Sequence, residues 1–241
     1  MEVTFNRETE SEMYGKTLWE NPNFPYVFRK NIVEYDMQSA SLSVSRRFHL
    51  LPDEKLDQFE RMPKEKRTRE VGLIQRDDKV FSNNMINGVL QTRKEFMMKN
   101  HIDESNVITL HSDAIIFIQS KPVVDHIDNV PFICKENWSS YIRYGRVEMF
   151  YGDGIITYKG MPTQMMQQHT LGICTFLLNV FEKIEEYDES IFPYLRKTQK
   201  MYLQDRLPEY WYIPFGTTGP YKNENMKLFS YIAKIAAKEV K

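Results

Sequence analysis

The chain has 241 residues, of which 41% are hydrophobic, 13% aromatic and 27% charged, and its formal net charge is −1. This aromatic content and balanced charge exclude a disordered chain, and two cysteines are too few for a disulfide scaffold or a cysteine-rich zinc module. The apolar run from Thr170 to Phe181 is shorter than the roughly 20 residues that span a bilayer, and no secretory signal opens the sequence. We therefore expect an intracellular globular protein that is not secreted and has no membrane partner.

The first third of the chain predicts one strand, one helix and a polar insert. Residues 1–30, acidic at first and then rich in Asn and Pro, are expected to form an irregular leader that packs through its aromatic side chains. Residues 31–36 are a short apolar stretch that ends in an acid, which suits a strand. Residues 42–51 have a moderately helical apolar spacing, and the almost wholly polar stretch 52–79 is punctuated by prolines.

The middle of the chain predicts a helix followed by antiparallel strands. Residues 80–100 place apolar side chains on one face at helical spacing. Residues 107–118 are two apolar runs around a polar step and predict a β-hairpin with Ser112 and Asp113 at its tip. Further strands are expected at 130–134, 141–151 and 155–158, with a hairpin turn at Gly152-Asp153-Gly154.

After Pro162 the pattern is helical to the end, over roughly 163–187, 190–206 and 223–240. Strands thus cluster in the middle of the sequence and helices follow them. This order predicts an α+β fold in which an antiparallel sheet has flanking helices.

Asp36 and Asp113 are the candidates for chemistry, because each follows an apolar strand. If the sheet places both strands side by side, the two carboxylates reach one edge and repel each other unless a cation lies between them. Mg²⁺ prefers oxygen ligands, and a pair of such ions can clamp the attacking and leaving oxygens of a phosphoryl transfer. The alternative is that both acids are turn or cap residues, where Asp is common.

The residues around these acids resemble two motifs of the family-B DNA polymerase palm. The stretch Tyr35-Asp36-Met37-Gln38-Ser39-Ala40-Ser41 is similar to the first motif, although an aromatic residue normally stands where this chain has Ser41. The stretch from Val107 to Phe117 is similar to the third motif, an Asp-Thr-Asp-Ser step, in which Asp113 keeps the second acid and His111 replaces the first. The resemblance implies that Asp36 and Asp113 are catalytic and that, with the Met37 carbonyl, they hold Mg²⁺ or Mn²⁺. His111 is a metal ligand, a proton donor or only a hydrogen-bonded surface residue.

The polar insert carries the candidate nucleotide-binding residues. Residues 61–76 hold six basic and two acidic side chains, a local excess that the overall charge of −1 averages out. The spacing Lys64-x-x-x-Thr68-Arg69-x-Val71-Gly72 is similar to the family's second motif, whose lysine holds the incoming triphosphate, without its Asn and aromatic residues. The resemblance implies nucleotide binding by Ser39, Lys64, Arg67 and Arg69. A solvated helical surface of mixed charge is the alternative.

The strands after the hairpin are similar to the family's primer-gripping strands, which end in Lys-Gly as Lys159-Gly160 does here. The resemblance implies that Arg143, Tyr144 and Lys159 bind the primer–template. The predicted organisation is a leader (1–30), a palm-like region (31–51 and 77–161), a basic fingers-like insert (52–76) and a helical thumb-like region (162–241).

Together these motifs predict a minimal or divergent family-B-like polymerase palm without an exonuclease domain. The expected reaction is template-directed nucleotidyl transfer with a nucleoside triphosphate by a two-Mg²⁺ mechanism, at a cytoplasmic or viral replication site and with a protein partner that completes the polymerase. The alternative is a catalytically degenerate palm that acts as a nucleic-acid-binding or replication scaffold. A nuclease or another Mg²⁺-dependent phosphotransferase would use the same two acids.

Overall fold

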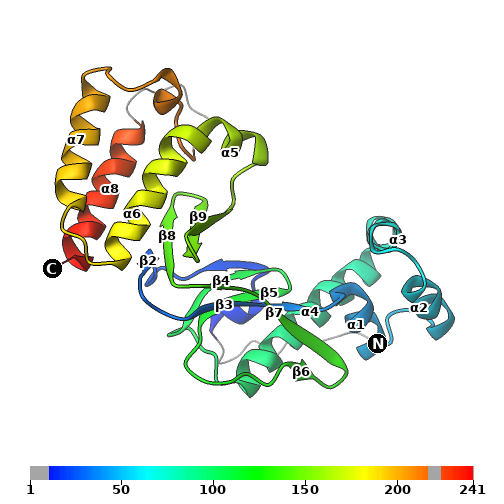
Figure 1. The fold of residues 1–241 in the computed structure, drawn as a ribbon. Coiled ribbons are helices and arrows are strands. Elements are labelled where there is room, and N and C mark those ends of the chain that lie inside the picture. The colour runs from blue at the N-terminus through cyan, green and yellow to red at the C-terminus, as the bar shows by residue number, and fades with distance from the viewer. Residues whose placement is uncertain (1–10, 217–223, 241) are drawn as a thin grey trace. The chain divides into compact units, whose positions relative to one another are not determined.

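The structure is a computed structural model that describes residues 11–216 and 224–240. The chain forms two compact units (Figure 1), one from Met1–Pro22 and Ile32–Asn137 and the other from Asn23–Asn31 and Trp138–Lys241. Each unit contains an antiparallel sheet and helices, which confirms the predicted α+β class. The division falls after Asn137, whereas the sequence predicted a palm-like region that continues to residue 161. The reason is that the strands after Asn137 form a separate sheet with its own helical cover.

The first unit has a sheet in the order β1-β4-β5-β3-β7-β6. Its strands are β1 (Leu18–Glu20), β3 (Ile32–Met37), β4 (Val107–His111), β5 (Ala114–Ile118), β6 (His126–Ile127) and β7 (Val130–Trp138). Its helices are the 3-10 helix η1 (Glu12–Gly15), α1 (Ala40–Arg47), α2 (Asp53–Glu60), α3 (Lys64–Asp77) and α4 (Lys79–Lys99). The predicted strand at 31–36, the helix at 80–100 and the hairpin at 107–118 are therefore confirmed.

Alternation along the strands of this sheet decides which side chains are covered by helices. Val33 pairs with Phe117 and Tyr35 with Ile115, and these side chains pack in one core with Phe96 of α4. Successive side chains of a strand point to opposite faces. Asp36 and Glu34 therefore lie on the face opposite to α4, together with the side chains of their register partners Ala114 and Ile116.

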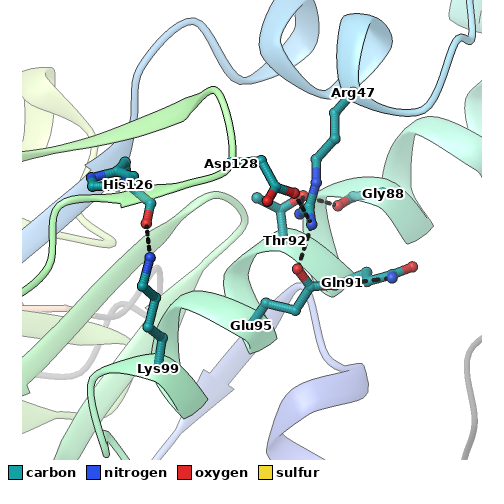
Figure 2. Close-up of polar contacts among 8 residues, drawn as sticks. All are labelled: Arg47, Gly88, Gln91, Thr92, Glu95, Lys99, His126 and Asp128. Atoms are coloured by element: carbon teal, nitrogen blue, oxygen red, sulfur yellow. Dashed lines mark hydrogen bonds and ion pairs between the residues drawn. The ribbon is translucent and has the colours of Figure 1, made fainter.

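Helices α1 and α4 approach closely at Gly88, the glycine inside the predicted helix. A Cβ atom at this position would lie 2.6 Å from Cγ1 of Val44 on α1, which is closer than two carbon atoms can pack. Figure 2 shows the polar contacts that lie along the same two helices: Arg47 of α1 donates to the Thr92 hydroxyl (2.9 Å) and also pairs with Glu95 of α4. The Thr92 hydroxyl in turn donates to the Gly88 carbonyl (2.8 Å).

The same Arg47 guanidinium reaches the turn that leads into β7. It lies 2.8 Å from Oδ2 of Asp128, between β6 and β7, and Lys99 at the end of α4 donates to the carbonyl of His126 on β6 (3.2 Å, Figure 2). Helix α1, helix α4 and the start of β7 are thus fastened together by charged side chains. This arrangement fixes the start of β7, one of the two strands that flank β3 and Asp36.

The second unit has a sheet in the order β10-β9-β8-β2. Its strands are β2 (Tyr26–Val27), β8 (Ser140–Tyr144), β9 (Val147–Gly152) and β10 (Ile155–Lys159). Its helices are α5 (Thr163–His169), the π-helix η2 (Thr170–Cys174), α6 (Thr175–Glu185), α7 (Ile191–Leu203), the 3-10 helix η3 (Glu209–Tyr212) and α8 (Glu224–Glu239). Helices α6, α7 and α8 lie side by side (Figure 1) and share an apolar core with Ile142 and Met149 of the sheet.

Two sequence predictions about strands were wrong. The single strand expected at 141–151 is a hairpin, because Gly145 has a φ of 60° and reverses the chain so that Tyr144 pairs with Val147. The leader was expected to be irregular, yet it contributes β1 to one sheet and β2 to the other. Its first ten residues lie outside the described part. The predicted turn at Gly152-Asp153-Gly154 is confirmed: Asp153 and Gly154 both have positive φ and Gly152 pairs with Ile155.

Candidate functional site

Asp36 and Asp113 meet at one end of the first unit's sheet. Asp36 is near the end of β3, opposite Ala114 of β5, and Asp113 directly precedes that alanine in the β4–β5 turn. The backbone N–H of Met37 donates to the Asp113 carbonyl (3.3 Å), which ties the end of β3 to the turn. The two side chains also interact electrostatically, so their carboxyl groups lie near each other. The antiparallel pairing of β3 with β5 therefore produces the juxtaposition that the sequence only implied.

The electrostatics of this pair follow from burial and like charge. Burial raises the pKa of Asp113, and the neighbouring carboxylate of Asp36 raises it further. Two neighbouring carboxyl groups do not both ionise easily unless a positive charge lies near them. A proton or a nearby positive charge therefore relieves the repulsion between the two acids.

A lysine that the sequence analysis did not single out already supplies one positive charge. Lys135 of β7 forms a direct ion pair with Oδ2 of Asp36. Its hydrogen bond to Asp36 raises the pKa of Lys135, and the charges of Asp36, Glu34 and Asp113 act in the same direction. No sequence pattern marks this lysine, because its role depends on β7 pairing with β3 across almost a hundred residues of chain.

Arg93 supports the turn that carries Asp113. Its side chain is fully buried in α4, and it donates to the Ser112 carbonyl (2.5 Å) and to the Lys16 carbonyl. Burial lowers the pKa of Arg93 to about 10, against the opposing effect of the Asp113 charge, so the guanidinium stays charged at neutral pH. Ser112 has a φ of 51°, an unusual backbone conformation for a residue other than glycine. The signal available in the sequence was an arginine on the apolar face of the predicted helix.

The candidate nucleotide-binding residues are only partly brought together. Arg67 of α3 donates to the Ser39 hydroxyl (3.3 Å), so the basic insert contacts the segment just after Asp36. Lys64 lies one helical turn before Arg67 and shares its face of α3. Arg69 is two residues after Arg67, which places it on the opposite side of the helix. The structure thus joins Ser39 and Arg67 and leaves Arg69 apart.

The candidate primer-binding residues belong to the second unit. Glu148 of β9 pairs in register with Arg143 on one side and with Lys159 on the other. Arg143 and Lys159 therefore share one face of this sheet, flanking a buried carboxylate. Tyr144 is on the other face, where its ring packs against Tyr231 of α8.

Gly160, the second residue of the Lys-Gly step, has a structural explanation of its own. Its φ is +75°, and a Cβ atom there would lie 2.0 Å from the Arg146 carbonyl oxygen. A side chain is excluded at this position by the backbone of the neighbouring hairpin. The glycine of the Lys-Gly step is therefore accounted for by packing within the second unit.

Few side chains among the described residues could hold a metal ion together. Across residues 11–216 and 224–240, no group of three or more His, Cys, Asp or Glu side chains is placed to hold a metal ion. His111, which replaces the family's additional acid, has its Nε2 3.3 Å from the Thr109 hydroxyl. Over the same residues, no helix is long and apolar enough to cross a bilayer.

The fold and the site define an α+β protein with two antiparallel sheets and a pair of carboxyl groups at one sheet end. The chain belongs to the bacteriophage PBS1 gene 130 protein family, which matches it over residues 9–241. No curated protein and no solved structure matches the sequence.

Proposed function

We propose that this protein is a polymerase-like nucleotidyltransferase whose catalytic acids are Asp36 and Asp113. The observation that carries the proposal is the position of these two acids at the same end of adjacent strands, where the charge of Asp36 raises the pKa of Asp113. Two-metal phosphoryl transfer needs acids that are rigidly held and close together, and both conditions are met by strands β3 and β5 and by the Arg93 support. Membership of a phage protein family agrees with action at a viral replication site in an infected cell.

The donor set fits Mg²⁺ or Mn²⁺ rather than a transition metal. Asp36, Asp113 and the Met37 carbonyl would offer only hard oxygen ligands, and Mg²⁺ is usually held by one or two carboxylates with substrate phosphates completing the shell. When bound, such ions activate the attacking hydroxyl and stabilise charge on the transferred phosphoryl group. The raised pKa of Asp113 supports the fit. Ionising both acids is unfavourable without a cation, so a bound cation would stabilise the doubly ionised pair.

The nucleotide and primer roles are assigned to this chain's basic residues. Arg67, with Lys64 on the same face of α3, would hold the triphosphate beside Ser39, because a guanidinium binds phosphate oxygens in a bidentate manner. Arg69 would bind the triphosphate from the other face of that helix. Arg143 and Lys159, with Tyr144 behind them, would contact the primer–template backbone from the second unit. A protein partner would complete the polymerase.

The test is primer extension by the purified full chain with four nucleoside triphosphates and either Mg²⁺ or Mn²⁺. We expect extension by the wild type and a loss of at least about 100-fold in Asp36→Asn and Asp113→Asn, because each removes one charge from the pair that would hold the metal. Asp53→Asn is the matched control, since Asp53 is an exposed acid in the first turn of α2. Extension that survives both site variants would contradict the proposal.

A second candidate function is a degenerate palm that binds nucleic acid without turnover. The specific observation that favours it is the absence, among the described residues, of a third metal-ligating side chain beside the two acids. Primer–template binding measured by fluorescence anisotropy separates the two functions. Binding that is unchanged in Asp113→Asn, with no extension or cleavage by the wild type, would support the scaffold. Cleavage of the strand without triphosphate would instead indicate a nuclease.

A further inference from the structure

We propose that Lys135 is a third functional residue beside Asp36 and Asp113: its ammonium group offsets part of their negative charge in the metal-free protein and must be displaced when a divalent cation binds. This inference rests on the proposed metal site. It adds a residue that no motif indicated and a property, the affinity for the metal, that this residue would set.

The first argument is that the ammonium already occupies one of the two oxygens with which Asp36 would bind a metal ion. Lys135 contacts Oδ2 of Asp36 directly. The Asp36 side chain is only 14% exposed, so few of its surfaces remain open to a second cation. An ion that coordinates this oxygen would bring a double positive charge against the ammonium at contact distance, where the repulsion is severe. The two cations therefore compete for the Asp36 carboxylate.

The second argument is that Lys135 can leave without disturbing the fold. Its side chain is 51% exposed, and β7 places it in a run of exposed residues from Ile133 to Asn137. The long stem of lysine lets the ammonium swing into water while the strand stays paired. A structural salt bridge in the core would not offer this freedom.

The third argument is the charge balance around Lys135. Asp36, Asp113 and Glu34 all act on this ammonium, and Asp36 and Glu34 lie on the same face of β3. A single lysine against these acids leaves the site negative overall, so a divalent cation still gains from binding. The expected outcome is a metal affinity that is finite but weaker than the acids alone would give.

The first experiment measures Mn²⁺ binding to the metal-free full chain by electron paramagnetic resonance of the free ion. Lys135→Gln should bind Mn²⁺ about tenfold more tightly than the wild type, which corresponds to roughly 1.4 kcal/mol. Lys135→Arg, which keeps the charge, should not gain affinity. Lys121→Gln is the matched control, because Lys121 follows the far end of β5 from the Asp113 turn.

The second experiment follows the displaced ammonium itself. Acetylation of Lys135 by a water-soluble anhydride, measured by peptide mass spectrometry, should become several-fold faster when Mn²⁺ saturates the wild type. Lys121 serves as the internal standard in the same spectra. Asp113→Asn, which weakens the metal site, should show a smaller acceleration at the same Mn²⁺ concentration.

The outcomes separate this inference from the proposed function. If the wild type binds Mn²⁺ and Lys135→Gln binds it equally, the role of Lys135 is overturned while the metal site stands. If Lys135 acetylation is unchanged at saturating Mn²⁺, the displacement is likewise overturned. If neither the wild type nor any Lys135 variant binds Mn²⁺, the metal site fails and this inference fails with it.

Discussion

Replacing Arg93 should destabilise the first unit more than any exposed charge does. In Arg93→Met the partly buried hydrogen bonds to the Ser112 and Lys16 carbonyls are lost. A hydrogen bond from a charged group contributes about 1.5–3 kcal/mol. Removing a buried charge returns part of its desolvation cost, so we expect a net loss of about 2–4 kcal/mol in the free energy of unfolding. Arg93→Lys keeps the charge but cannot span both carbonyls, and it should lose roughly half as much.

Tryptophan fluorescence can report on the first unit alone. Trp19 belongs to that unit, whereas Trp138 and Trp211 belong to the other. In a background with Trp138→Phe and Trp211→Phe, urea unfolding followed by Trp19 measures the stability of the unit that contains Arg93. This matters because two compact units need not unfold together, and a single transition would then mix their free energies.

The matched control for Arg93→Met is Arg76→Met. Arg76 is exposed on α3 and pairs with its sequence neighbour Asp77, and exposed pairs of this kind contribute about 0–1 kcal/mol. If Arg93→Met destabilises the first unit by no more than this control does, the reasoning about the hydrogen bonds of Arg93 to the two carbonyls is refuted. Arg93 would then have no role in holding the Asp113 turn.

Three further predictions concern packing and pH. Gly88→Ala should lower the free energy of unfolding, measured by urea titration, by about 1–3 kcal/mol, because the new Cβ atom meets Val44. This loss should outweigh the better helix propensity of alanine. An increase in stability would contradict the close approach of α1 and α4. Gly160→Ala should cost the second unit at least about 2 kcal/mol, since it combines positive φ with a clash against the Arg146 carbonyl, and a calorimetric melting temperature equal to the wild type would disprove it. Burial lowers the pKa of His169, so the folded chain binds fewer protons than the unfolded one. Its contribution to stability is complete above about pH 6.5 and falls by up to about 1.4 kcal/mol per pH unit below it; His169→Phe should flatten that part of the profile, and an unchanged slope would rule this out.

The structure gives the His169 prediction its physical basis. The side chain is fully buried beside the π-helix η2, and its ring meets Phe215 edge-on. The Pro214 backbone favours the charged form, but burial outweighs it, because a buried imidazolium loses most of its solvation. Protonation therefore favours the unfolded chain.

Local signals in the sequence were sufficient to predict the helices and hairpins whose patterns are complete within a short stretch of chain. Helix α4 followed from apolar spacing, the β4–β5 hairpin from two apolar runs around Ser112 and Asp113, and the β9–β10 turn from Asp153-Gly154. The hairpin inside 141–151 was missed, although Gly145 was its signal, because the flanking apolar residues read as one continuous strand. The strands β1 and β2 were not predicted, because very short strands are defined by the strand with which they pair.

By itself, then, the sequence determined the α+β class, the main helices, and the two acids as candidates, since composition, periodicity and turn residues act over short stretches of chain. Only the tertiary structure decided that Asp36 and Asp113 lie at the same sheet end, that Lys135 pairs with Asp36, and that Arg93 donates to the Ser112 carbonyl. It also separated Tyr144 from Arg143 and Lys159 by the alternation of the second sheet. The physical reason is that these relations depend on strand order and register, which are set by the packing of residues far apart in the chain.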